Sequence, residues 1–175
     1  GSAIHTVESG VINNEAQSEE EALDLVARFL SYVPSSVFEM PPLVETDDPK
    51  NREEEELLSI IPRERRRIYK CRRLIELVMD KDSILEISPR YGRSIVTCLA
   101  RLGGRPVGVI ANDPTFYGGG LTRAAAGKME SFIDICDTFH LPIVNFVDQP
   151  GTVVGPEAER AGTVKGSVRV VSAIE

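Results

Sequence analysis

The chain has 175 residues, of which 42% are hydrophobic and 27% charged, a composition typical of a globular protein with a real core. Its formal charge of −7 and pI near 5.0 argue against nucleic acid and an anionic membrane surface as partners. No signal peptide is recognisable and no apolar run is long enough to span a bilayer, so we expect no membrane partner and a cytoplasmic or mitochondrial-matrix location.

The first predicted helix covers residues 18–34, SEEEALDLVARFLSYVP, which begin with a serine cap and an acidic first turn. Its expected buried face consists of Leu23, Val26, Ala27, Leu30 and Phe29. Residues 35–62 then contain paired prolines and an acidic run without either period, which indicates an extended linker between two units.

A second helix is predicted over residues 63–83, which begin with the basic run RERRRIYKCRR. Its apolar residues share one helical face: Ile68, Cys71, Leu74, Ile75 and Val78. The basic residues are most simply a solvated face, and contact with an anionic cofactor is the alternative.

Three short strands without an intervening helix follow, over residues 83–88, 93–104 and 105–113, with Gly103-Gly104 as the turn of a hairpin. Residues 121–140 have the period of a helix, with apolar side chains at Ala125, Met129, Phe132, Ile133 and Cys136. The strand LPIVNFVD, residues 141–148, is almost wholly apolar, so we expect burial on both faces. Pro156 then favours a new helix start, and residues 164–174 read as a last helix.

Three glycines, Gly118 to Gly120, stand between a strand and a helix in NDPTFYGGGLTRAAAGK, residues 112–128. Such a run lets backbone N–H groups approach an anion or a developing oxyanion, although glycines also serve as ordinary loop residues. A phosphate-binding P-loop is excluded, because Gly120 is too far from Gly127 and Met129 replaces the required Ser or Thr. The turn Pro150-Gly151 follows the next strand, and loops after neighbouring strands are where an α/β layout collects binding groups.

Side chains suited to catalysis or metal binding are scarce. Three cysteines, Cys71, Cys98 and Cys136, lack ligand spacing and read as packed thiols, and with two histidines in the chain we expect no metal. Asp113 and Asp148 are best explained as turn residues. We therefore assign no catalytic side chain and expect backbone N–H groups to stabilise an oxyanion.

Residues 103–162, from GGRPVGVIANDP through DTFHLPIVNFVDQPG to GPEAERAG, strongly resemble the carboxyltransferase (β) subunit of biotin-dependent acyl-CoA carboxylases of the propionyl-CoA carboxylase type. Residues 1–34 resemble the end of the family's N-terminal subdomain, 35–62 a linker, and 63–175 the first half of the biotin-side C-terminal subdomain. The resemblance implies an α/β, crotonase-like spiral of ββα units, here incomplete.

The resemblance also implies a reaction, in which a carboxyl group moves from carboxybiotin to the α-carbon of an acyl-CoA. Implied partners are a biotin carboxylase or biotin carrier subunit, acyl-CoA, and further copies in a hexamer. The biotin-side wall maps onto Asn112, Phe116, Gly118, Gly119, Gly120, Pro150 and Gly151 as backbone binding positions. His5 lies in a stretch like the family's GG-A-x-H-T segment, where packing is the expected role.

Two family segments are missing, namely the glycine-rich CoA-side loop and the downstream Gly-Gly-Ala segment. We therefore expect the chain alone to be inactive, its helix at 164–174 to lack partners, and its exposed apolar surface to drive self-association. The alternatives are a non-catalytic crotonase-like assembly or binding module, and a subunit of a biotin-dependent acyl-CoA decarboxylase.

Overall fold

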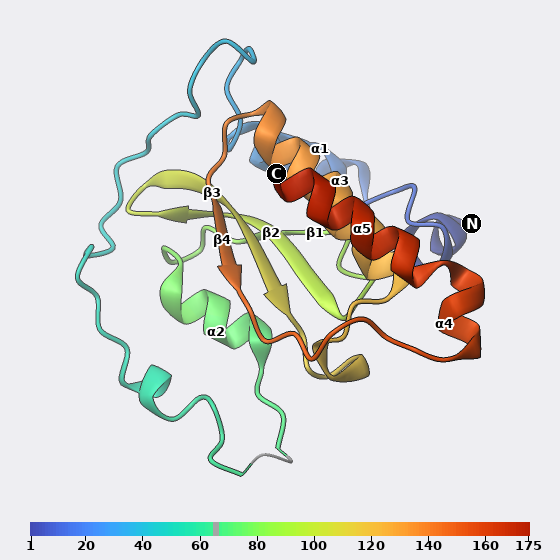
Figure 1. Ribbon diagram of the computed structural model, residues 1–175. Helices are drawn as coiled ribbons and strands as arrows, with labels where there is room; N and C mark the ends of the chain where they lie inside the picture. Colours follow the sequence, from blue (N-terminus) through green and yellow to red (C-terminus); the bar gives the residue numbers. More distant parts are fainter. Residues whose placement is uncertain (65–66) are drawn as a thin grey trace.

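The computed structural model describes residues 1–64 and 67–175 and contains one four-stranded sheet, in the order β1-β2-β3-β4 (Figure 1). The strands are β1 (Leu85–Ile87), β2 (Ile95–Leu102), β3 (Arg105–Asn112) and β4 (Ile143–Phe146). β1, β2 and β3 are antiparallel neighbours, whereas β4 runs parallel to β3. The predicted hairpin turn is confirmed, and Gly104 is required there because an added Cβ would lie 1.9 Å from the Val44 carbonyl oxygen.

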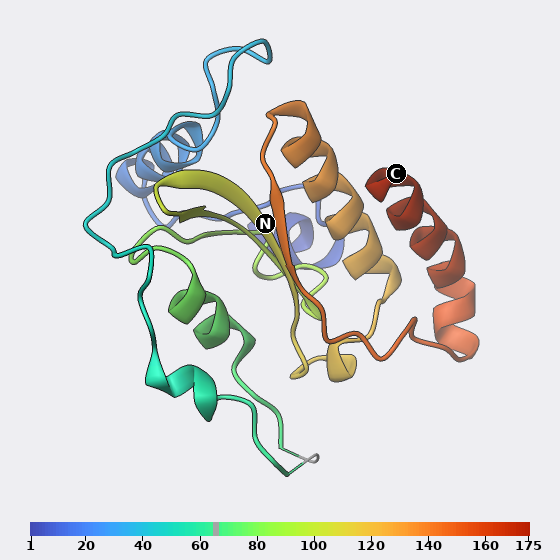
Figure 2. The ribbon, with the colours of Figure 1, turned by 60° about the vertical axis from the view of Figure 1, so that its left-hand side comes forward.

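Helices cover both faces of the sheet, with α2 (Cys71–Val78) on one side and α3 (Arg123–Thr138) and α5 (Thr163–Ile174) on the other (Figure 2). Successive residues of β2 point to opposite faces, so Ile95 and Leu99 join the core under α3 while Val96 and Cys98 join the core under α2. This burial on both faces explains the nearly continuous apolar sequence of β2 and β3.

The third predicted helix is confirmed as α3. Thr122 caps it by accepting a hydrogen bond from the Ala125 N–H at 3.0 Å, and all five predicted apolar residues are buried. Gly108 of β3 allows the close approach of the helix, since a Cβ there would lie 2.4 Å from the Cys136 sulfur. α3 ends where the N–H of Leu141 bonds to the Cys136 carbonyl.

The predicted buried face of the first helix was wrong except for Phe29. Ser18 does cap α1 (Glu19–Leu30), but Leu23, Val26 and Leu30 are more than half exposed, and Ala27 is exposed as well. Phe29 packs against the core as predicted, and its partner there is Leu25, which was not predicted. Apolar residues occupy two sides of α1, and helical spacing alone does not tell which side meets the sheet.

Three further expectations are corrected. α2 begins only at Cys71, so Ile68 precedes the helix and is exposed, while Arg65 and Arg66 lie outside the described residues. β4 is not buried on both faces, because it is the outermost strand of this sheet and Ile143 is 39% exposed. α5 does have a partner, since Val170 is buried and Gly166 faces Ala126 of α3.

The predicted start at Pro156 is confirmed by α4 (Pro156–Ala161). The exposed side of α5 carries Val164, Val168, Val171 and Ile174.

The N-terminal segment lies against β1 and the loop between β1 and β2. Asn14 donates to the Glu86 carbonyl at 2.8 Å, Ser88 donates to the Asn13 side chain at 2.6 Å, and Gly10 lies against the ring of Tyr91. His5 is exposed in the π-helix η1 (Ile4–Glu8), so the expected packing role was wrong, and its neighbour Thr6 is the buried residue.

Residues 35–62 have little regular structure beyond the 3₁₀ turn η2 (Glu55–Leu58) (Figure 1). Arg52 attaches this segment to the end of α2 by donating to the carbonyls of Leu77 and Met79. Tyr32 and Val33 belong to the core under α3. The division of the chain into two subdomain parts, residues 1–34 and 63–175, joined by a linker at 35–62 stays a prediction. None of the helices in residues 1–64 and 67–175 combines the length and apolar character needed to cross a bilayer.

Candidate functional site

Two loops meet beyond the carboxyl ends of the parallel strands β3 and β4, and Asn112 connects them. Asn112 is buried at the end of β3, where its Nδ2 donates to the Gly119 carbonyl at 2.8 Å. Its Oδ1 accepts from the backbone N–H of Asp148, beyond β4, at 3.1 Å. One side chain therefore determines the position of both loops at once.

A backbone bridge adds to this connection. The N–H of Leu121 donates to the Gly151 carbonyl and the N–H of Val153 to the Leu121 carbonyl, both at 3.0 Å. The structure thus brings the glycine run and Gly151 together. Pro150 is exposed beside them, and Phe116 lies beneath the guanidinium of Arg93, whose Cζ is 3.8 Å from the ring centroid.

The three glycines differ in what requires them. Gly118 and Gly119 have φ of 61° and 82°, in the left-handed region. A Cβ at Gly119 would lie 2.9 Å from the Asp148 carbonyl oxygen, and one at Gly120 would lie 3.0 Å from that of Tyr117, whereas one at Gly118 would meet nothing within 4 Å. Close packing explains why Gly119 and Gly120 cannot carry a side chain, whereas the space beside Gly118 is open.

Two N–H groups of the glycine run already have acceptors. Those of Gly119 and Gly120 donate to the carbonyls of Phe116 and Tyr117 at 2.9 and 3.0 Å. Leu121 separates the run from the cap residue Thr122, so the glycines precede the first turn of α3 rather than forming it. In this loop conformation an anion would have to contact neighbouring groups or the open backbone at Gly118.

Both candidate carboxylates are held in structural contacts. The Thr115 N–H donates to Asp113 Oδ1 at 3.0 Å, which confirms the turn interpretation, and Arg72 donates to Asp113 Oδ2 at 2.7 Å. Asp148 Oδ2 accepts from the hydroxyl of Tyr69 at 3.0 Å. Burial, together with this contact, raises the pKa of Tyr69 well above its ordinary value.

Arg72 is an ion-pair centre that the sequence patterns did not reveal. Besides Asp113, its guanidinium holds Glu86 of β1 through two hydrogen bonds of 2.8 and 2.7 Å. These contacts, with Glu86 first, raise the pKa of Arg72. A basic run is usually a solvated face, so only the folded arrangement distinguishes Arg72 from its neighbours.

Lys128 is a second cation whose contacts the sequence patterns did not reveal. It is 6% exposed on α3, and its Nζ donates to the carbonyls of Ser88, Tyr91 and Ile95 at 2.9, 3.0 and 2.7 Å. Burial lowers the pKa of Lys128 to about 8. Its three acceptors lie in the loop before β2 and at the first residue of that strand, so this lysine anchors residues 88–95.

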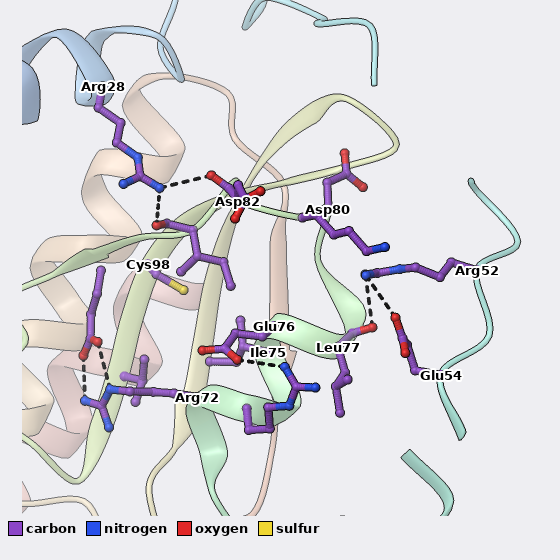
Figure 3. Close-up of a pocket in the computed structure, with 15 residues that line it drawn as sticks. Arg28, Arg52, Glu54, Arg72, Ile75, Glu76, Leu77, Asp80, Asp82 and Cys98 are labelled. Atoms are coloured by element: carbon purple, nitrogen blue, oxygen red, sulfur yellow. Dashed lines mark hydrogen bonds and ion pairs between the residues drawn. The ribbon is translucent and has the colours of Figure 1, made fainter. Parts of the chain in front are cut away.

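One cavity, of about 760 Å³, lies between α2 and the sheet (Figure 3). Arg28 donates to the carbonyls of Asp82 and Ile84, Arg52 to that of Leu77, and Arg72 pairs with Glu86. Cys98 also lines it, and burial raises the pKa of this thiol to about 12. The arginines of this cavity are therefore occupied by structural contacts.

A second cavity, of about 1020 Å³, adjoins the glycine loop, and among the seven predicted site residues it is lined by Phe116 alone. Its wall continues through Tyr117, the start of α3 and residues 153–158 before and into α4. Within the described part of the chain, no group of three or more His, Cys, Asp or Glu side chains could hold a metal ion.

The model of the carboxyl transferase domain matches residues 1–175. The chain belongs to this family. The resemblance predicted from the sequence is thereby confirmed.

Relatives within the family differ in their named activities. The chain is 37% identical to the uncharacterized carboxylase YngE of Bacillus subtilis and 36% identical to the methylmalonyl-CoA decarboxylase subunit alpha of Veillonella parvula, and covers 34% of each. It is 32% identical to the mitochondrial propionyl-CoA carboxylase beta chain of Homo sapiens, of which it covers 32%. Each match includes 99% of this chain, which therefore spans about a third of the length of these relatives.

Solved structures confirm the crotonase-like fold. The transcarboxylase 12S structure with methylmalonyl-coenzyme A bound superposes with a TM-score of 0.94 at 30% identity over 99% of this chain and 34% of that one. A single-chain, multi-domain long-chain acyl-CoA carboxylase gives a TM-score of 0.83 at 33% identity, with 98% of this chain and 17% of that one covered.

Proposed function

We propose that this chain is part of a carboxyltransferase that moves a carboxyl group between carboxybiotin and the α-carbon of an acyl-CoA. The observation that carries the proposal is the family match over residues 1–175, supported by the close superposition on transcarboxylase 12S. The proposed units are the end of one subdomain (1–34), a linker (35–62) and the first half of the biotin-side subdomain (63–175).

The biotin-side wall is proposed to consist of the seven residues of the two loops: Asn112, Phe116, Gly118, Gly119, Gly120, Pro150 and Gly151. Their fit to biotin is supported by the aromatic side chain of Phe116 and by the open backbone at Gly118, which a flat ring system can approach. Bound carboxybiotin would supply the carboxyl group. Asn112 acts by holding the two loops together, because its amide nitrogen donates to Gly119 and its amide oxygen accepts from Asp148.

Backbone groups rather than side chains are proposed to stabilise the developing oxyanions. Asp113 and Asp148 each accept a hydrogen bond from a neighbouring donor, Arg72 and Tyr69 respectively, so both carboxylates are engaged in structural contacts. Preorganised N–H groups suit a reaction in which negative charge develops on carbonyl oxygens. The rest of such a site is proposed to come from segments beyond these 175 residues.

The proposed partners are a biotin carboxylase or biotin carrier subunit, the acyl-CoA, and further copies of the protein. The last is supported by the hexamer named for transcarboxylase 12S. A cytoplasmic or mitochondrial-matrix location is proposed, and the mitochondrial propionyl-CoA carboxylase relatives support the second possibility.

Decarboxylation of an acyl-CoA is the second candidate function. It is favoured by the 36% identity to the methylmalonyl-CoA decarboxylase subunit alpha of Veillonella parvula, against 32% for the human propionyl-CoA carboxylase beta chain. The two reactions share the carboxyl transfer step and differ in its direction.

The test is to express the full reading frame containing this chain and measure transfer between free biotin and several acyl-CoAs in both directions, with residues 1–175 alone as a comparison. We expect transfer by the full protein and none by the chain alone. Absence of transfer in both directions from a folded full-length protein would leave the non-catalytic assembly module as the better account.

A further inference from the structure

The two acidic side chains beside the candidate loops are both held by the segment that begins α2. Asp113 follows Asn112 at the end of β3 and Asp148 lies beyond β4, so each loop carries one carboxylate. Arg72 donates to Asp113 at 2.7 Å and Tyr69 to Asp148 at 3.0 Å. Figures 1 and 2 both show the start of α2 beside the ends of β3 and β4. One short segment therefore contacts both loops.

The Arg72 contact has a fixed direction. The Nε and Nη2 atoms of Arg72 donate to the two carboxylate oxygens of Glu86 on β1, at 2.8 and 2.7 Å, and its Nη1 donates to Asp113. Because the guanidinium is planar, the two-bond pair with Glu86 determines where the third bond points. The Asp113 side chain is 4% exposed, so its carboxylate has little access to water as an alternative partner. Arg72 thus connects the glycine loop to β1.

The Tyr69 contact holds the second loop through a different part of Asp148 than Asn112 does. Asn112 Oδ1 accepts from the backbone N–H of Asp148 at 3.1 Å, whereas the Tyr69 hydroxyl donates to the Asp148 side chain. Burial first, and then the contact with Asp148, raises the pKa of Tyr69, so the hydroxyl stays protonated and can donate at neutral pH. The second loop is therefore held through both its backbone and its side chain.

The start of α2 is itself held in place. Cys71 and Ile75 are buried in the core between α2 and the sheet, and the Tyr69 ring packs against the same core. A shift of Tyr69 or Arg72 would therefore require the displacement of a packed helix, and the start of α2 can act as a fixed support for both loops.

We propose that Tyr69 and Arg72 are positioning residues that set the relative position of the two loops and, through it, the affinity for biotin. Asn112 joins the loops to each other, whereas Tyr69 and Arg72 join each loop to α2. Neither is among the seven residues of the proposed wall, so both act through the carboxylates of Asp113 and Asp148. The inference rests on the proposed function, in which these loops form the biotin-side wall.

The kinetic test measures carboxyl transfer by the full-length protein with free biotin and the acyl-CoA that supports transfer. Tyr69→Phe removes a single hydroxyl, and we expect it to raise the KM for biotin at least about 3-fold while the KM for the acyl-CoA changes less than about 2-fold. Tyr32→Phe is the matched control, because it also loses a tyrosine hydroxyl bond, to the Ser83 carbonyl near the hairpin end of the sheet. We expect the control to leave both KM values within about 2-fold of the parent values.

Two further comparisons test the contacts themselves. Asp148→Asn keeps an acceptor oxygen for Tyr69, so its KM for biotin should lie closer to the parent value than that of Asp148→Ala. In the Asp148→Ala background, Tyr69→Phe should have almost no further effect, because its partner is already absent. Arg72→Gln should raise the KM for biotin, and Arg73→Gln, whose ion pairs lie at the surface, should not.

Hydrogen exchange of the backbone gives a readout that does not depend on carboxyl transfer. We expect residues 146–153 to exchange faster in Tyr69→Phe, and residues 112–121 faster in Arg72→Gln, than in Tyr32→Phe. The proposal is overturned if the loops exchange at the parent rate, if the KM for biotin is unchanged, if the KM for the acyl-CoA rises equally, or if Tyr32→Phe has the same effects. Faster exchange of the loops in a full-length protein that shows no transfer would support the positioning role and refute the proposed function alone.

Discussion

The Oδ1 of Asn112 accepts the backbone N–H of Asp148 at 3.1 Å, across 36 residues of sequence, while the Nδ2 of the same amide holds Gly119. Removing the amide in Asn112→Ala leaves the buried carbonyl of Gly119 and the part-buried N–H of Asp148 without their partner. We expect a loss of about 2 kcal/mol in the free energy of unfolding, measured by urea denaturation. Asn112→Asp keeps the acceptor for Asp148 but places a buried carboxylate oxygen against the Gly119 carbonyl, so it should lose stability as well. Equal stability of Asn112→Ala and the parent chain would contradict this bridging role.

The neighbouring glycines predict unequal effects of the same substitution. Gly118→Ala adds a methyl group into open space, so its cost is that of a left-handed φ, about 1 kcal/mol. Gly119→Ala has a similar φ and also drives Cβ to 2.9 Å from the Asp148 carbonyl oxygen, so the backbone has to shift. We expect the greater loss of stability, and in the full-length protein the greater loss of kcat, for Gly119→Ala. A larger effect of Gly118→Ala would show that the open glycine, not the packed one, carries the function.

Local patterns predicted β2, β3 and α3 correctly because most of the apolar residues of these elements lie in the two cores. They failed for α1, where apolar residues occupy two faces, and for β4, where an apolar strand lies at the edge of the sheet. The convergence of two loops followed from the order of strands and helices. The contacts that hold these loops, such as Arg72 with Asp113 over 41 residues, join distant positions, and no local spacing encodes them.

Adjacent arginines on α2 provide a matched pair of variants. Arg72→Gln leaves the carboxylate of Asp113, whose side chain is 4% exposed, without its cation. We expect the free energy of unfolding to fall by about 2 kcal/mol, because the 41% exposure of the Arg72 side chain limits the effect to this range. Arg73→Gln removes pairs with Glu56 and Glu76 at the surface and should cost less. In a double-mutant cycle, Asp113→Asn should reduce the effect of Arg72→Gln; strictly additive losses would show that the pair is not coupled.

The exposed valines of α5 predict self-association of the isolated chain. Val164, Val168 and Val171 are each more than half exposed on one helix, and burying such a surface against another copy is favourable. We expect light scattering to give a molar mass that rises with concentration and falls in Val168→Lys. Ser172→Lys adds the same charge nearby without removing apolar area, and should reduce association less. A monodisperse monomer at every concentration would count against this expectation.

Lys128 predicts a change of stability with pH whose sign follows from burial. The pKa of Lys128 is lowered from 10.5 to about 8, so between these values the unfolded chain binds more protons than the folded one. The contribution of this lysine to stability therefore rises from pH 8 to 10.5, by up to roughly 3 kcal/mol, and is lost again as pH falls from 10.5 to 8.

The comparison with Lys128→Met isolates most of this contribution, because Lys128 does not affect the pKa of Cys71 or Cys136 and their titrations cancel. Cys98 differs, since the charge of Lys128 lowers the pKa of this thiol and is lost in the variant. The destabilisation caused by Lys128→Met should grow between pH 8 and 10.5 in urea unfolding experiments, and Lys165→Met controls for the loss of a surface charge. A destabilisation that stays constant or shrinks would mean that the three carbonyls of Ser88, Tyr91 and Ile95 stabilise the ammonium group more than burial destabilises it. In that case Lys128 would hold the loop 88–95 as a permanent cation.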